Sequence, residues 1–86
     1  MNITREQLLQ KLLHIFEENF EIKEPGLNDD LRETYEFDSI DAIGLLVEIE
    51  RIMGVKLSQE EKKQSMDIRT INDICDYVEA MYSARS

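Results

Sequence analysis

The chain has 86 residues, enough for one domain with a modest core and little spare volume for an enclosed enzyme pocket. Its 19 acidic and 10 basic side chains give a formal net charge of −9, which disfavours nucleic acid and anionic membranes as partners. Cys75 is the only cysteine, so an internal disulfide and a structural zinc site are excluded. The apolar runs are too short for a signal peptide or membrane insertion, and we expect a cytoplasmic monomer.

The first predicted helix begins near Thr4, because Thr4 and Gln7 have the spacing of a capping box. The helix is expected to fade over residues 19–24, ahead of the strong breaker Pro25-Gly26. Between these limits the apolar residues recur at helical spacing and predict a core-facing stripe. The stripe consists of Leu8, Leu9, Leu12, Leu13, Ile15 and Phe16.

A long connection, about residues 23–37, follows this helix. Structureless loops of this length are uncommon in compact domains, so we expect it to be pinned to the core or to be functional. Leu27 and Leu31 are the candidate pins, whereas Tyr35 and Phe37 have no obvious place.

A second helix is predicted from Ser39 to about Met53. Asp38 is a good N-cap residue, and Asp41 adds negative charge to the first turn, where the helix dipole favours it. Gly54 is placed to end the helix.

This second helix has apolar residues on two opposite faces. At about 100° per residue, Ile40, Ile43 and Val47 lie opposite the larger apolar face, which must face the core. An exposed apolar stripe edged with carboxylates is typical of a protein-docking surface. The alternative is that the preceding loop covers the stripe with Tyr35 or Phe37. The core face consists of Ala42, Leu45, Leu46, Ile49, Ile52 and Met53. The carboxylates beside the stripe are Asp38, Asp41, Glu48 and Glu50.

The remaining chain predicts a short third helix and a longer last helix. Ser58 and Glu61 have capping-box spacing and start the short helix, which runs to about Ser65. The last helix starts at a cap formed by Thr70 and Asp73, and residues 83–86 are expected to fray. No strand pattern is found, so we expect an all-α single domain over residues 1–86, with three longer helices and one short third helix. The core-facing residues of the last helix are Ile71, Ile74, Cys75, Val78, Met81 and Tyr82.

Ser39 has none of the signatures of a catalytic serine. An activated serine needs a base within reach, and the only histidine, His14, lies in the first helix. No G-x-S-x-G turn is present either. A phosphoester on Ser39 would instead sit at the positive end of a helix dipole. The alternative is that Ser39 only shares the capping work of Asp38.

The segment Asp38-Ser39-Ile40-Asp41 resembles the signature of the acyl carrier protein family, in which a serine at the start of the second of four helices carries 4′-phosphopantetheine. Residues 37–55, FDSIDAIGLLVEIERIMGV, are similar to the family's recognition helix, and residues 68–78 to its last helix. The resemblance implies a four-helix bundle and a non-catalytic carrier with the arm covalently attached to Ser39. Such a carrier holds acyl intermediates as thioesters and presents them to biosynthetic enzymes.

The resemblance also implies the partners. Asp38 matches the aspartate before the attachment serine, and Asp41 and Glu50 match acidic positions that face basic patches of enzymes. The stripe of Ile40, Ile43 and Val47 matches the family's apolar contact positions. The implied partners are a phosphopantetheinyl transferase and acyl-transferring or acyl-modifying enzymes of a fatty acid, lipid or related pathway.

Four positions depart from the family pattern. Glu36 stands where glycine is common, and Phe37 stands where a small residue is common. Gly44 replaces a common acidic residue, and Arg51 reverses the charge at another acidic position. Our hypothesis is that Gly44 and Arg51 narrow the partner set, as in a specialised carrier.

Three other functions remain open at this point. The domain can be an interaction module without a prosthetic group, or a carrier of aminoacyl, peptidyl or D-alanyl groups. A small calcium-binding protein is suggested by Asn28-Asp29-Asp30, but the spaced ligands, central glycine and terminal glutamate of an EF-hand loop are missing.

Overall fold

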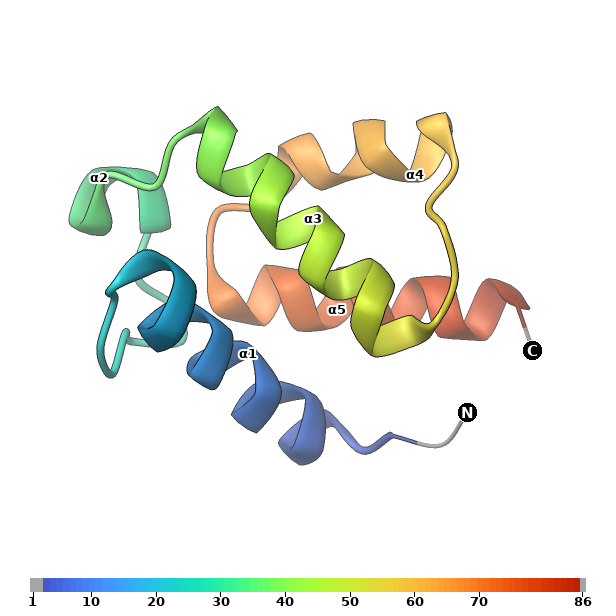
Figure 1. Ribbon diagram of the computed structural model, residues 1–86, viewed down its shortest axis with the longest axis horizontal. Helices are drawn as coiled ribbons and strands as arrows, with labels where there is room; N and C mark the ends of the chain where they lie inside the picture. The colour runs from blue at the N-terminus through green and yellow to red at the C-terminus, as the bar shows by residue number, and fades with distance from the viewer. Residues whose placement is uncertain (1–2, 86) are drawn as a thin grey trace.

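The computed structural model describes residues 3–85 and contains only helices, turns and loops within that range (Figure 1). The all-α class predicted from the sequence is confirmed. Five α-helices and one 3-10 turn follow one another within residues 3–85. Their bounds are Arg5–Phe20 (α1), Leu31–Tyr35 (α2), Ser39–Met53 (α3), Gln59–Gln64 (α4), Ser65–Asp67 (η1) and Ile71–Arg85 (α5).

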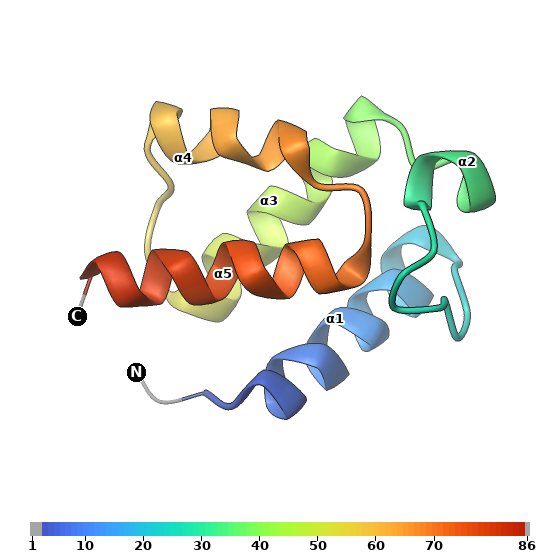
Figure 2. The ribbon, with the colours of Figure 1, turned by 180° about the vertical axis from the view of Figure 1, so that it is seen from behind.

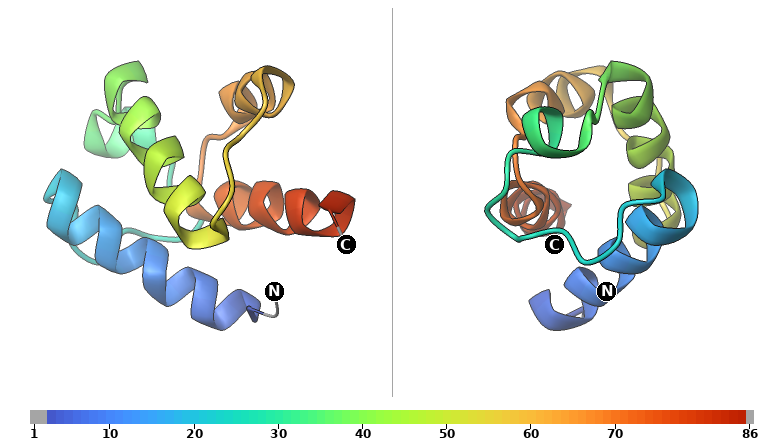
Figure 3. Two further views of the ribbon diagram at one scale, coloured as in Figure 1. Left: turned by 45° about the vertical axis from the view of Figure 1, so that its right-hand side comes forward. Right: turned by 90° about the vertical axis from the view of Figure 1, so that its left-hand side faces the viewer.

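Four helices surround the core. Seen end-on, α4, α3, α1 and α5 follow one another around it (Figure 3). From the opposite side, α5 lies in front, with α4 on one side of it and α1 on the other (Figure 2). Helix α3 runs obliquely across the far face, between α1 and α4. The three longer helices α1, α3 and α5 and the short α4 form the predicted arrangement.

Reciprocal capping boxes fix the starts of the four bundle helices. In each box a side-chain oxygen at the cap accepts from a backbone N–H three residues later, while that later side chain accepts from the cap N–H. Gly54 ends α3 with φ of 70°, as predicted from its place after the last apolar residue. The pairs are Thr4 with Gln7, Asp38 with Asp41, Ser58 with Glu61 and Thr70 with Asp73.

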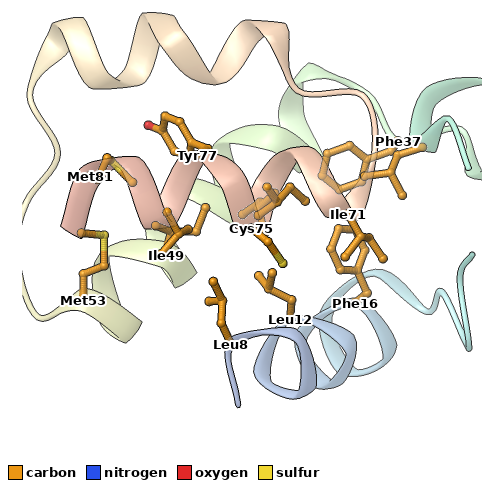
Figure 4. Packing of buried hydrophobic residues seen from close by; sticks show 14 of the residues in the cluster. Leu8, Leu12, Phe16, Phe37, Ile49, Met53, Ile71, Cys75, Tyr77 and Met81 are labelled. Carbon is orange, nitrogen blue, oxygen red and sulfur yellow. The ribbon is translucent and has the colours of Figure 1, made fainter. Parts of the chain in front are cut away.

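The core forms where α1 meets α5. Leu8, Leu12 and Phe16 project from α1 toward Ile71 and Cys75 of α5 (Figure 4), and all five side chains are essentially fully buried. Burial raises the pKa of the Cys75 thiol, because the thiolate would lose its hydration. Cys75 is therefore a protonated core residue at neutral pH, without nucleophilic character.

The connection between α1 and α3 contains the one-turn helix α2, which the sequence did not predict. The Asp30 carboxylate starts α2 by accepting from the backbone N–H groups of Arg32 and Glu33. A helix of five residues is too short to show a periodic apolar pattern, so only its cap residue carries a signal. Leu31 is fully buried, and Leu27 packs against the core, as expected of pins.

The aspartates of this connection are engaged in its own turns. Asp29 Oδ2 accepts from the backbone N–H of Gly26, at 3.1 Å, and from the Tyr35 hydroxyl, at 2.9 Å. The hydrogen bond to the Asp29 carboxylate raises the pKa of the Tyr35 phenol. Within residues 3–85, no three His, Cys, Asp or Glu side chains are grouped to hold a metal ion. These carboxylates therefore have a structural role in the loop.

Helix α5 continues further than the sequence suggested. Fraying was expected over residues 83–86, but the helix extends through Arg85, and Ser86 lies outside the described residues. Val78 and Met81 are buried and hold the last turns against the core. No glycine or proline interrupts residues 71–85, so the backbone has no reason to leave the helical conformation earlier.

Candidate functional site

Ser39 is the first residue of α3, and its side chain is exposed. The neighbouring Asp38 performs the capping: its Oδ1 accepts from the Asp41 N–H at 2.9 Å, and Asp41 Oδ2 accepts from the Asp38 N–H at 3.3 Å. The Ser39 hydroxyl has no hydrogen-bond partner among residues 3–85. The alternative that Ser39 shares the capping work is therefore wrong, and its hydroxyl is available for chemistry.

A groove opens beside Ser39, between α3 on one side and α4 with η1 on the other. Its volume is about 470 Å³, and its walls are mainly aliphatic. No histidine is among the described residues that line it, so the lining offers no imidazole base to the serine hydroxyl. We call it the Ser39 groove. It is lined by Arg32, Ser39, Ala42, Ile43, Leu46, Val47, Glu50, Lys62, Ser65 and Met66.

A much smaller cavity lies behind the groove. Its volume is about 20 Å³, and it reaches the core residues Phe37 and Leu45. It shares four residues with the walls of the Ser39 groove: Arg32, Ala42, Leu46 and Ser65. Space of this size holds about one water molecule, so an acyl chain would fit the outer groove and not this inner cavity.

The apolar residues opposite the core face of α3 are exposed. Ile40, Ile43 and Val47, the outer stripe, expose 76%, 63% and 43% of their surface. Phe37 does not cover them, because it is 5% exposed and lies in the core. Tyr35 does not cover them either, because its hydroxyl is bound to Asp29 in the loop. The alternative of a covered stripe is therefore wrong.

The predicted acidic flank of this stripe is less uniform than the sequence suggested. Glu48 forms an ion pair with Arg51, with Oε1 and Nη1 3.1 Å apart. Glu50 is half-buried, and its Oε2 accepts from the backbone N–H of Leu57 at 2.8 Å, which fixes the loop after α3. The carboxylates of the C-terminal half of α3 are thus engaged within the chain, unlike a freely presented acidic face.

The backbone conformation at Glu36 explains why glycine is common at this position in the family. Glu36 ends α2 in the left-handed conformation, with φ of 55° and ψ of 34°. Glycine adopts this conformation without the Cβ clash that other residues suffer there. The family's common glycine at this position therefore suits the turn that leads into Asp38, and Glu36 occupies it under strain.

Replacing Glu36 with glycine is expected to stabilise the protein. Relief of the left-handed strain, about 1–2 kcal/mol, should exceed the 0.5–1 kcal/mol entropic cost of glycine, giving a net gain of up to about 1.5 kcal/mol. The measurement is the free energy of unfolding by chemical denaturation. Glu33→Gly is the control, since Glu33 is inside α2 and glycine should destabilise it. A free energy of unfolding lower for Glu36→Gly than for the wild-type protein would contradict the inference that Glu36 is strained.

Phe37 and Gly44, two of the residues that depart from the family pattern, both lie beside the ring of Phe20. Phe37 packs against Phe16 and Phe20, with ring centroids 5.5 and 5.3 Å away, so its bulk fills the core beside the site. A Cβ on Gly44 would lie 3.7 Å from the Phe20 ring, an ordinary contact. Space therefore does not require glycine at this position, and nothing in the structure explains its presence.

These features define a small helical carrier domain: an unengaged serine hydroxyl at a helix start, an apolar groove beside it and an exposed apolar stripe. The model of the family described as "Phosphopantetheine attachment site" matches residues 7–78. The chain belongs to the acyl carrier protein family, as the resemblance of residues 38–41 indicated.

Relatives with known names agree with this assignment. "Acyl carrier protein 2" of Ralstonia nicotianae is 30% identical over 84 residues, covering 95% of this chain and 100% of the relative. The acyl carrier protein of Rubrobacter xylanophilus is 32% identical over 76 residues, 86% of this chain and 90% of the relative. That of Coprothermobacter proteolyticus is 28% identical over 78 residues, 88% and 92% of the two chains. No solved structure matches the chain significantly.

The prosthetic group of this family is a covalently attached 4′-phosphopantetheine. The residues present fit such a group, because the exposed Ser39 hydroxyl has no competing partner and the Ser39 groove begins beside it. No helix within residues 3–85 has the length and apolar character needed to cross a bilayer.

Proposed function

We propose that residues 1–86 act as one monomeric cytoplasmic domain that carries acyl groups on a 4′-phosphopantetheine arm at Ser39. The observation that carries the proposal is the exposed Ser39 hydroxyl without a hydrogen-bond partner in residues 3–85, placed at the start of α3 beside an apolar groove. The family membership supplies the identity of the arm.

The chain contributes a positioned nucleophile to its own modification. In the proposed step, Ser39 Oγ attacks the pantetheine-bearing phosphorus of coenzyme A and forms a phosphodiester, while the pyrophosphate bond breaks and 3′,5′-ADP leaves. The hydroxyl proton goes to a base of the phosphopantetheinyl transferase, since the groove offers no histidine among its described residues. The N-terminus of α3 favours the added negative charge through its dipole. Once attached, the arm supplies a thiol that holds an acyl group as a thioester.

We propose that partner enzymes dock on the outer stripe next to Ser39. Its exposed aliphatic side chains offer contact area, and Asp38 and Asp41 at the same end of α3 suit a basic partner surface. At the other end of α3, Arg51 pairs with Glu48, and Glu50 accepts from the Leu57 N–H. This charge pattern supports a specialised partner set within a fatty acid, lipid or related biosynthetic pathway.

Replacing Ile43 with glutamate is expected to lower the kcat/KM of transferase-catalysed loading tenfold or more, about 1.4 kcal/mol, as for a docking hot spot. Ile43 is 63% exposed, so the thermal midpoint should hardly change. Val55→Glu is the matched control, because Val55 is an exposed aliphatic residue beyond the end of α3. Equal kinetics for Ile43→Glu and the wild-type protein would place docking elsewhere.

The carrier function is tested by incubating the apo protein with an acyl-coenzyme A and a promiscuous phosphopantetheinyl transferase. The expected result is a mass gain of one acyl-phosphopantetheine, followed by loss of only the acyl group on hydroxylamine treatment, because hydroxylamine cleaves thioesters. A folded protein that gains no mass would support an interaction module without a prosthetic group and defeat the proposal.

A further inference from the structure

The Ser39 groove has a local charge opposite to that of the whole chain. Its lining includes the cations Arg32 and Lys62 and one carboxylate, Glu50. The chain as a whole has 19 acidic and 10 basic side chains. The cations come from two different elements, α2 and α4, and converge on the same apolar space.

Neither cation is neutralised by an ion pair within the described chain. The arginines that form ion pairs there are Arg5 and Arg51, and the polar contacts of residues 3–85 include none from the Arg32 or Lys62 side chain. The one carboxylate of the lining, Glu50, already accepts the hydrogen bond from the Leu57 N–H. The lining therefore has two cations against one carboxylate, a net positive charge beside aliphatic walls.

We propose that this groove binds carried acyl groups whose far end is anionic, such as the half-thioester of a dicarboxylic acid. The inference rests on the proposed carrier function, because the acyl group reaches the groove from Ser39. The aliphatic walls of Ala42, Leu46 and Val47 contact the methylene chain, and Arg32 or Lys62 pairs with the terminal carboxylate. Ser39 and Glu50 are eleven residues apart on α3, so the groove extends about 17 Å from the attachment point.

The opposing explanation is that both side chains only cover aliphatic surface with their stems and keep their charges in water. A substitution that keeps the stem and removes the charge separates the two explanations. Lys62→Met and Arg32→Gln meet this requirement. Lys63→Met is the matched control, because Lys63 is the exposed neighbour of Lys62 on α4 and does not line the groove.

The experiment compares two carried groups of equal length, octanoyl and suberoyl, which differ in the terminal carboxylate. Each is loaded from its coenzyme A thioester by a promiscuous transferase and verified by intact mass. The readout is the rate of thioester hydrolysis in mildly alkaline buffer, relative to the same thioester on free coenzyme A. Lys62→Met or Arg32→Gln should speed suberoyl hydrolysis about two- to fivefold, the range for an exposed ion pair. The same substitutions should not change the rate of octanoyl hydrolysis, and Lys63→Met should change neither rate. High salt should speed suberoyl hydrolysis in the wild-type protein, because it screens the ion pair.

Several outcomes would overturn the inference. Equal effects of the substitutions on octanoyl and suberoyl proteins would show that the cations act on the arm's phosphodiester or only on packing. No effect on either would show that the charges stay in water. Failure of the wild-type protein to accept any acyl-phosphopantetheine would defeat the carrier function itself, and with it this inference. Successful loading without selective protection would defeat the inference alone.

Discussion

Replacing Ser39 with alanine is expected to abolish the mass gain from coenzyme A completely. Ser39 has an exposed hydroxyl without a partner in residues 3–85, whereas the other serine of the groove, Ser65, donates its hydroxyl to the Lys62 carbonyl at 2.5 Å. Intact-mass spectrometry after incubation with coenzyme A and a promiscuous transferase measures the effect.

Two controls make this result specific to the hydroxyl. Ser65→Ala removes a hydroxyl from the same groove and should load like the wild-type protein. The free energy of unfolding of Ser39→Ala should lie within about 0.5 kcal/mol of the wild-type value, because Asp38 performs the capping and the Ser39 side chain is exposed. A Ser39→Ala protein that still gains one phosphopantetheine would overturn the assignment of the attachment residue.

Replacing Phe37 with alanine is expected to cost about 3–5 kcal/mol of unfolding free energy. Phe37 is 5% exposed and contacts the rings of Phe16 and Phe20, so truncation leaves a cavity at the junction of α1 and the start of α3. Because small domains are stable by only about 5–15 kcal/mol, this loss is a large fraction of the total, and the unfolding midpoint should move to a much lower denaturant concentration. Chemical denaturation followed by far-ultraviolet circular dichroism measures the loss.

The control for Phe37 is a leucine, which retains most of the buried volume. Phe37→Leu should cost about 1–1.5 kcal/mol, because the aromatic contacts are lost but little cavity forms. A Phe37→Ala protein within 0.5 kcal/mol of the wild type would be typical of a surface residue. That result would return Phe37 to the role of a cover over the outer stripe.

The parts of the fold that were predictable from the sequence are those that local chemistry determines. The cap pairs Thr4 with Gln7 and Ser58 with Glu61 marked two helix starts correctly, because each pair satisfies backbone groups within four residues. The opposite faces of α3 were predictable because an isolated helical wheel already separates Ile43 from the buried side of the helix.

The parts that were not predictable depend on contacts distant in the sequence. The burial of Phe37 requires two rings of α1, and a loop residue gives no periodic signal for such a contact. The bond from Glu50 to the Leu57 N–H depends on how the chain turns after α3. The positive φ of Glu36 did have a sequence signal, because the family resemblance already set Glu36 apart from a common glycine. The positive groove was missed because Arg32 and Lys62 are thirty residues apart in the chain.

The central claim is that Ser39 carries the phosphopantetheine arm, and the most direct measurement is to locate the arm on the wild-type protein. The protein is loaded from coenzyme A by a promiscuous transferase, digested, and its peptides are sequenced by tandem mass spectrometry. We predict that the modification occurs solely on the peptide containing Ser39 and that fragment ions assign it to that residue. Localisation to any other residue, or a fully loaded protein with an unmodified Ser39 peptide, would contradict the account.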